Sequence, residues 1–140
     1  MKFISLARYS SQMKGLDYFL SGAVKKFKKI NEFEYTAIVD GSNNNNKYNV
    51  YININKPRSS KCTCPFAEGN KVICKHMIAT YFKVKPELAK QIADELIAEE
   101  EEEEREFTRK YNEIFEYVNS LTEEEAKSLL IEYLLEKDYY

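Results

Sequence analysis

Three cysteines and the only histidine of this 140-residue chain are confined to the short stretch between residues 62 and 76. They form two pairs, Cys62-x-Cys64 and Cys74-x-His76. Three thiolates and an imidazole are the donor set of a tetrahedral Zn²⁺ site, and such a shell leaves no open position for a substrate water. The pattern therefore predicts one structural zinc ion, bound by Cys62, Cys64, Cys74 and His76.

Other uses of these residues fit the sequence less well. A disulfide leaves one of the three cysteines unpaired, and a redox pair more typically reads Cys-x-x-Cys beside a βαβ unit. Buried cysteines without a ligand have no reason to cluster with the only histidine. A zinc deaminase needs His-x-Glu and Pro-Cys-x-x-Cys, which are both absent. Glu68 lies between the two pairs, but a closed zinc shell gives a base nothing to act on. We expect no catalytic residue and no enzyme activity.

The sequence Cys62-x-Cys64-Pro65, followed by Cys74-Lys75-His76 and Met77-Ile78-Ala79, resembles the SWIM-type zinc finger, and in particular small stand-alone bacterial members. The resemblance extends over about residues 16–84. It implies a β-hairpin that supplies the first two ligands and a helix start that supplies the last two. The family occurs attached to helicase-like ATPases and transposase-related proteins and is thought to bind DNA or proteins. No phosphate-binding Gly-x4-Gly-Lys-Ser/Thr loop is present here.

Hydrophobic spacing predicts an α+β fold. Apolar residues recur at loose helical spacing over residues 3–20, with an interruption at Ser10-Ser11, and alternate at strand spacing over 33–39 and 48–54. A further short strand is expected between residues 58 and 64, and a short buried helix after His76. The prediction is thus an N-terminal helix, a small antiparallel β-sheet and a zinc finger completed by a helix.

Residues 86–140 have a different character. Helical spacing continues from Pro86 to about residue 119, through six consecutive glutamates, and Ser120-Leu121-Thr122 then breaks the helix. Thr122 and Glu125 form a capping box for a final helix. We expect these two helices to pack as an antiparallel hairpin. The predicted organisation is therefore a strand-rich lead-in with zinc finger at 1–85 and an acidic helical tail at 86–140.

Charge is divided between the two halves. Residues 1–86 contain 15 Lys and Arg against 5 Asp and Glu, whereas residues 87–140 contain 6 against 18. A basic half predicts a polyanionic partner, most simply DNA, contacted with little sequence preference. The alternative is that these lysines are ordinary solvated side chains. The candidate contacts are Lys25, Lys26, Lys28, Lys29, Arg58, Lys61, Lys71 and Lys75.

A protein partner is the second hypothesis. The apolar stripes of the C-terminal helices can dock on another protein or form a homodimer, with the finger acting as a scaffold. No apolar run is long enough to cross a bilayer, and no signal peptide is recognised. We expect a cytoplasmic protein with no small-molecule substrate. The start at Met1 and the capped last helix favour a complete chain over a fragment of a larger assembly.

Overall fold

A computed structural model describes residues 2–43 and 45–138. The chain divides into two compact units, Met1–Asp94 and Glu95–Tyr140, and each is considered by itself. The boundary between these units falls inside the longest helix. The domain boundary expected at residues 85 and 86 stays a prediction.

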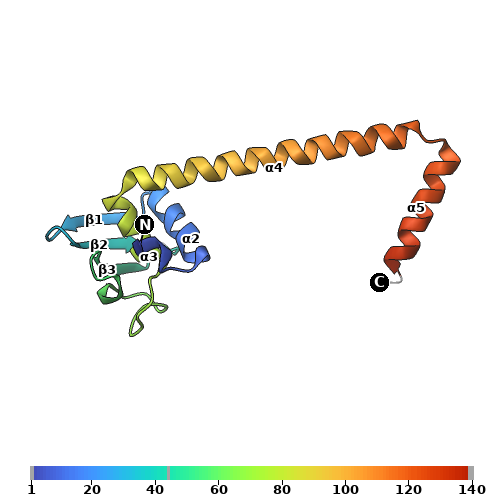
Figure 1. Ribbon diagram of the computed structural model, residues 1–140. Helices are drawn as coiled ribbons and strands as arrows, with labels where there is room; N and C mark the ends of the chain where they lie inside the picture. Colours follow the sequence, from blue (N-terminus) through green and yellow to red (C-terminus); the bar gives the residue numbers. More distant parts are fainter. Residues whose placement is uncertain (1, 44, 139–140) are drawn as a thin grey trace. The chain divides into compact units, whose positions relative to one another are not determined.

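The fold is α+β, as the sequence predicts, and Figure 1 shows the order of its elements. In chain order they are α1 (Lys2–Ser5), α2 (Tyr9–Leu20), β1 (Val24–Lys29), β2 (Glu34–Asp40), β3 (Lys47–Asn53), the 3₁₀ turn η1 (Pro57–Ser59), β4 (Lys61–Cys62), α3 (Lys75–Val84), α4 (Pro86–Ser120) and α5 (Glu123–Asp138).

One sequence boundary was placed wrongly. The N-terminal helical region is interrupted before Tyr9, and Ser10 and Ser11 lie inside the first turn of α2. The first N–H groups of a helix have no partner within the helix, so serine side chains are tolerated there although they disfavour a helix interior. The break between α1 and α2 therefore precedes the two serines instead of coinciding with them.

The first unit has three layers. Its antiparallel sheet has the order β1-β2-β3-β4, α3 packs against one face of the sheet, and α2 packs against α3 (Figure 1). Because α3 has neighbours on both sides, every residue from His76 to Phe82 is buried. The short buried helix expected after the histidine is therefore the central layer of this unit.

Alternation along the strands gives the sheet two different faces. In β2, Tyr35, Ala37 and Val39 are buried, whereas the residues between them are partly exposed. Val50 and Ile52 of β3 continue the buried face, because Val50 pairs with Ala37 and Ile52 with Tyr35. Since side chains alternate across a strand, the opposite face presents the remaining residues to solvent. Among the helices and strands that the structure describes in this unit, none packs across that outer face as α3 does across the inner one.

Gly15 explains how α2 approaches α3 so closely. A Cβ atom at this position would lie 2.6 Å from Cβ of Ile78 and 2.9 Å from the carbonyl oxygen of Lys75. Real side chains do not make such contacts, so only glycine fits. Glycine is unfavourable in a helix interior, but at this position it allows the two helices to pack.

In the second unit, helix formation matches the expectation but packing does not. The capping box is confirmed: the Thr122 N–H donates to Glu125 Oε1 at 3.1 Å, and the Glu125 N–H donates to Thr122 Oγ1 at 3.2 Å. The apolar residues expected to form the hairpin seam are nevertheless exposed, among them Phe107 at 71% and Tyr133 at 59%. From Glu95 to Asp138 no residue is buried.

The hairpin seam is therefore not formed between α4 and α5. A physical reason lies in α5, where the runs Leu129-Leu130-Ile131 and Tyr133-Leu134-Leu135 spread apolar side chains around the helix. Such a distribution gives no single stripe that could face one neighbour. None of the helices described is long and apolar enough to cross a membrane.

Candidate metal centre and basic groove

The end of a strand and the start of a helix place the cysteines and the histidine. Cys62 ends β4 opposite Val50 of β3, and Cys64 follows two residues later, so both side chains point to the buried side of the sheet. Cys74 is the N-cap residue of α3, and His76 lies in the first turn of that helix. All four side chains are buried.

The donor atoms of these residues lie close to one another. The three sulfurs and one imidazole nitrogen are all within 4.8 Å of each other. Nδ1 of His76 is 3.7 Å from Sγ of Cys62 and 3.9 Å from Sγ of Cys74. In a tetrahedral zinc site a sulfur and a nitrogen ligand are about 3.6 Å apart, and two sulfurs about 3.8 Å. The residues therefore fit a single metal ion, and the imidazole would bind through Nδ1.

Backbone N–H groups support negative charge on all three sulfurs. Hydrogen bonding with Cys62, followed by that with His76 and with the N–H of Met77, lowers the pKa of Cys74 to about 4 despite burial. The pKa of Cys62 is raised, because its thiol is hydrogen-bonded to Cys74 and buried, although the N–H of Cys64 acts in the opposite sense. Burial raises the pKa of Cys64, against which the N–H of Ala67 acts.

These pKa directions have a common cause. Three buried sulfurs this close together repel as thiolates, so without a cation only some of them can ionise. A dication would remove that restriction, and the backbone N–H groups would then serve as donors to metal-bound thiolates. The donor set, the geometry and the hydrogen bonds all suit a metal such as zinc.

Two tyrosines fix the imidazole, and the sequence did not single out either. The ring of Tyr48 from β3 lies 4.6 Å from the His76 ring, and the ring of Tyr18 from α2 lies 5.3 Å away. Tyr48 could have been found from its strand, because it alternates in phase with Val50 on the inner face. Tyr18 gives no such signal, since its approach depends on the packing of α2 against α3.

The loop between the two ligand pairs is a tight structure. The N–H groups of Ala67 and Glu68 both donate to the carbonyl of Cys64, at 3.2 and 2.9 Å. Gly69 adopts a φ of +78°, which glycine reaches without strain. Arg58 Nη1 donates to the carbonyl of Lys71 at 2.9 Å and so ties the loop to the 3₁₀ turn. Glu68 lines the groove described next and is not grouped with the metal-ligand atoms.

A groove of about 1120 Å³ runs over the outer face of the sheet, and one wall of it is this loop. Its lining includes five of the eight basic residues singled out in the sequence, and among the described residues that line it only Glu68 is acidic. The five are Lys26, Lys28, Arg58, Lys61 and Lys71.

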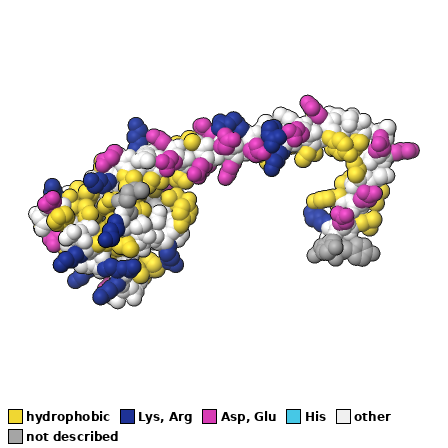
Figure 2. Space-filling model, in the orientation of Figure 1, with side chains coloured by type: hydrophobic (Ala, Val, Ile, Leu, Met, Phe, Trp, Pro, Cys, Tyr) yellow, Lys and Arg dark blue, Asp and Glu magenta, His cyan; other side chains and the backbone are white. Residues whose placement is uncertain are grey.

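The other three predicted basic residues do not line the groove. Lys75 begins α3, where its Nζ lies 5.3 Å from the centre of the Tyr18 ring. Lys25 and Lys29 lie on the same edge strand as Lys26 and Lys28 and are exposed. Figure 2 shows Lys and Arg side chains over the first unit and acidic side chains along α4 and α5.

Comparison with known protein families agrees with this site. Residues 48–85 match the SWIM zinc finger, a stretch that contains all four metal-ligand candidates and the helix after them. The match begins inside β3, so the resemblance that we placed upstream of it, from residue 16, stays a prediction. No curated protein and no solved structure matches the chain. Residues 48–85 are a SWIM zinc finger, whose four cysteine and histidine residues are arranged around a site for one metal ion.

Proposed function

We propose that this protein is a zinc-stabilised module that binds nucleic acid, in the first place DNA, through the basic groove and with little sequence preference. The observation that carries the proposal is the gathering of five cationic side chains in one groove beside the metal centre, opposed by a single carboxylate. Ordinary solvated lysines would have no reason to converge in this way.

The charge of the groove suits the phosphate backbone. Lysine and arginine side chains that neutralise phosphates release counterions, and this release dominates affinity that does not depend on sequence. Phosphate contacts carry no direct sequence information. Weak sequence preference and a strong dependence on salt are the expected behaviour.

The metal has a structural role in this proposal. Cys62, Cys64, Cys74 and His76 would hold one Zn²⁺ in a closed shell, with no position left for a reacting water. The ion would fix both ends of the loop that walls the groove, because Cys64 precedes that loop and Cys74 follows it. The protein is then a binding module rather than an enzyme and takes no small-molecule substrate. Thiolate ligands suit a reducing compartment, and the location that we propose is therefore the cytoplasm.

The test is a titration of fluorescently labelled DNA, as duplex and as single strand, over a range of salt concentrations. Its variant is the triple substitution Arg58→Gln, Lys61→Gln and Lys71→Gln. We expect tight binding at low salt for the wild type. The triple variant should bind more weakly, and the slope of log affinity against log salt should be shallower by roughly 2 to 3.

The matched control removes the same charge elsewhere. Lys14→Gln, Lys83→Gln and Lys90→Gln change three exposed lysines on helices α2, α3 and α4, outside the groove lining. This control should bind as the wild type does. Equal weakening in both triple variants would show that net charge and not the groove determines binding, and absence of binding by the wild type at low salt would refute the proposal.

A second candidate function is protein interaction through α4 and α5, for which we propose a homodimer. The supporting observation is the exposure of a series of large apolar side chains in the second unit, between 43% and 71%, with none buried. An apolar surface of this extent on a monomer is unusual and typically marks an interaction site. A second copy of the chain offers the same apolar side chains in return.

Sedimentation equilibrium of the full zinc-loaded chain tests this second candidate. We expect a dimer whose dissociation is promoted by the double substitution Phe115→Ser and Leu134→Ser. The matched control, Asn112→Ser and Glu132→Ser, changes exposed polar residues on the same two helices and should leave the dimer intact. A wild type that sediments as a monomer at every concentration would rule out the homodimer.

A further inference from the structure

The lining of the groove has a feature that phosphate binding does not explain. The register of the sheet places Lys28 of β1, Thr36 of β2, Tyr51 of β3 and Lys61 of β4 in one row across the outer face. Neighbouring strands are about 4.8 Å apart. A tyrosine therefore lies next to one lysine and two strands away from another, on an uncovered sheet face.

Tyr51 differs from the tyrosines of the first unit whose rings contact another ring. Tyr35 stacks on Phe27 at 5.6 Å, Tyr48 and Tyr18 contact His76, and Tyr81 stacks on Phe3 at 5.0 Å. Tyr51 is half-buried in the groove lining, and among the described residues its ring has no aromatic or cationic partner and its hydroxyl no hydrogen bond. The ring is thus available to a ligand in the groove.

The edge strand is distorted in a way that adds charge to the same face. The pairing of β1 with β2 shifts register between Lys25 and Lys28, and Lys26 within this bulge has a φ of 46°. A non-glycine residue in the left-handed region is strained, and bulges commonly redirect a side chain near a functional site. Lys25 pairs with Ile38 and Lys28 with Thr36, so two residues three apart both take outer-face positions, which strict alternation in an unbroken strand would not allow. Lys26, within the bulge, and Lys28 both line the groove.

We propose that the outer face of the sheet binds single-stranded nucleic acid, with Tyr51 as a platform on which an unpaired base stacks. The surrounding Lys26, Lys28, Arg58, Lys61 and Lys71 would contact the phosphates on either side. A basic groove whose lining includes an aromatic ring is the arrangement with which proteins bind single strands. In a duplex the base faces are covered by their neighbours, so a duplex can use the cations but not the ring. This inference rests on the proposed function and specifies its partner.

The test compares three fluorescently labelled probes of equal length: a thymidine oligonucleotide, a uridine oligonucleotide and a mixed-sequence duplex. The zinc-loaded full chain is titrated as wild type, Tyr51→Ala and Tyr51→Phe. Loss of one stacked base should weaken single-strand binding by about 5- to 150-fold in Tyr51→Ala. Tyr51→Phe should retain it, because the ring remains. Duplex binding should change less than about twofold in both variants.

Two controls separate stacking from structural damage. Tyr9→Ala removes a tyrosine that is 67% exposed on α2, outside the groove, and should not affect any probe. Lys26→Gly removes one groove charge while relieving the strained backbone, so it should weaken binding of all three probes without lowering the thermal unfolding midpoint. Zinc content of each variant confirms an intact finger.

The outcomes are distinguishable. If the wild type binds none of the probes, both the proposed function and this inference fail. If it binds the duplex at least as tightly as the oligonucleotides and Tyr51→Ala binds like the wild type, this inference alone is overturned. Weakening of duplex and single-strand binding to the same extent in Tyr51→Ala would likewise reject the stacking platform. The ratio between the thymidine and uridine probes identifies DNA or RNA as the preferred strand.

Discussion

The two units of this molecule are stabilised in opposite ways. In Met1–Asp94, strands and helices of ordinary length enclose a core of buried side chains, and a buried cysteine-histidine site joins the sheet to α3. In Glu95–Tyr140, the helical segments bury none of the described residues. The first unit depends on contacts between residues distant in sequence, whereas the interactions of the second, over its described residues, lie mainly within each helix and at the turn between them.

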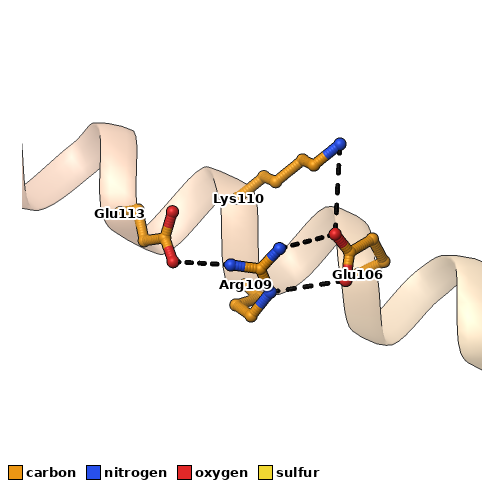
Figure 3. A network of polar contacts seen from close by, with 4 residues as sticks. All are labelled: Glu106, Arg109, Lys110 and Glu113. Carbon is orange, nitrogen blue, oxygen red and sulfur yellow. Dashed lines mark hydrogen bonds and ion pairs between the residues drawn. The ribbon is translucent and has the colours of Figure 1, made fainter.

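The local contacts of the second unit are visible in the centre of α4. Arg109 donates to Glu106 on one side and to Glu113 on the other, with Nη1 2.7 Å from the Glu113 carboxylate, while Lys110 is 4.0 Å from Glu106 (Figure 3). Ion pairs of this kind at exposed positions contribute little, and helix stability in proteins comes mostly from packing. Because these helices bury no described residue, the second unit is the part of the chain to which our homodimer proposal applies.

Metal removal should have the largest effect, and it should destabilise the first unit while leaving the second unchanged. Zinc binding supplies folding free energy of order 10 kcal/mol at such sites, because the ligands are not organised in the unfolded chain. A chelator should therefore abolish amide protection over residues 58–84 and leave the helical signal of the second unit unchanged. Hydrogen exchange with mass spectrometry measures both regions at once, and Cys74→Ser should reproduce the effect without chelator. Near-native protection of residues 58–84 after metal removal would contradict this expectation.

A substitution at the contact of α2 with α3 should have the next largest effect. Gly15→Val introduces atoms where Ile78 and the Lys75 carbonyl already lie, and overpacking of this kind costs about 3 kcal/mol. Thermal unfolding of the zinc-loaded chain, followed by near-ultraviolet circular dichroism, measures the loss. Ser10→Val places the same side chain at an exposed position of α2 and should cost far less. Similar midpoints for the two variants would show that the helices separate easily.

The capping box tests the second unit on a smaller scale. Thr122→Ala removes the hydroxyl that accepts the N–H of Glu125 and should cost α5 about 1 kcal/mol. The hydrogen bond from the Thr122 N–H lowers the pKa of Glu125, so its contribution is present above the normal carboxyl pKa and is lost as pH falls through the lowered value. Amide exchange of residues 123–128, measured at neutral and at acid pH, follows both effects. Protection at the metal site should not respond to Thr122→Ala.

The smallest effect is expected from the ion pairs of α4. Arg109→Gln removes the ion pairs that the central arginine makes with Glu106 and Glu113. We expect a slight loss of helicity at low salt that vanishes at high salt. Circular dichroism of the wild type and variant at two salt concentrations detects it. Lys90→Gln, in the first-unit part of α4, provides the comparison. A large loss of helicity in Arg109→Gln would mean that the second unit depends on its charges far more than packing arguments allow.

Local patterns predicted the elements well. Alternation predicted β2 and β3 to within a residue or two, Pro86 marked the start of α4, and the Thr122–Glu125 pair marked the start of α5. The same patterns failed for the hairpin seam, because apolar spacing shows which side chains need a partner but not whether the same chain supplies it. They also misplaced the break before α2, since serine is tolerated in a first turn.

The chemistry of the metal centre could be predicted from residue types and spacing, because three cysteines paired with one histidine admit few uses besides a closed metal site. The surroundings of that site could not be predicted in this way, because they depend on how the chain folds. Tyr18 and Tyr48 reach the imidazole from a helix and a strand far apart in sequence, and five basic residues meet Tyr51 in one groove because sheet register and loop geometry bring them together. Ligand chemistry is local to the chain, whereas a surface is a property of the fold.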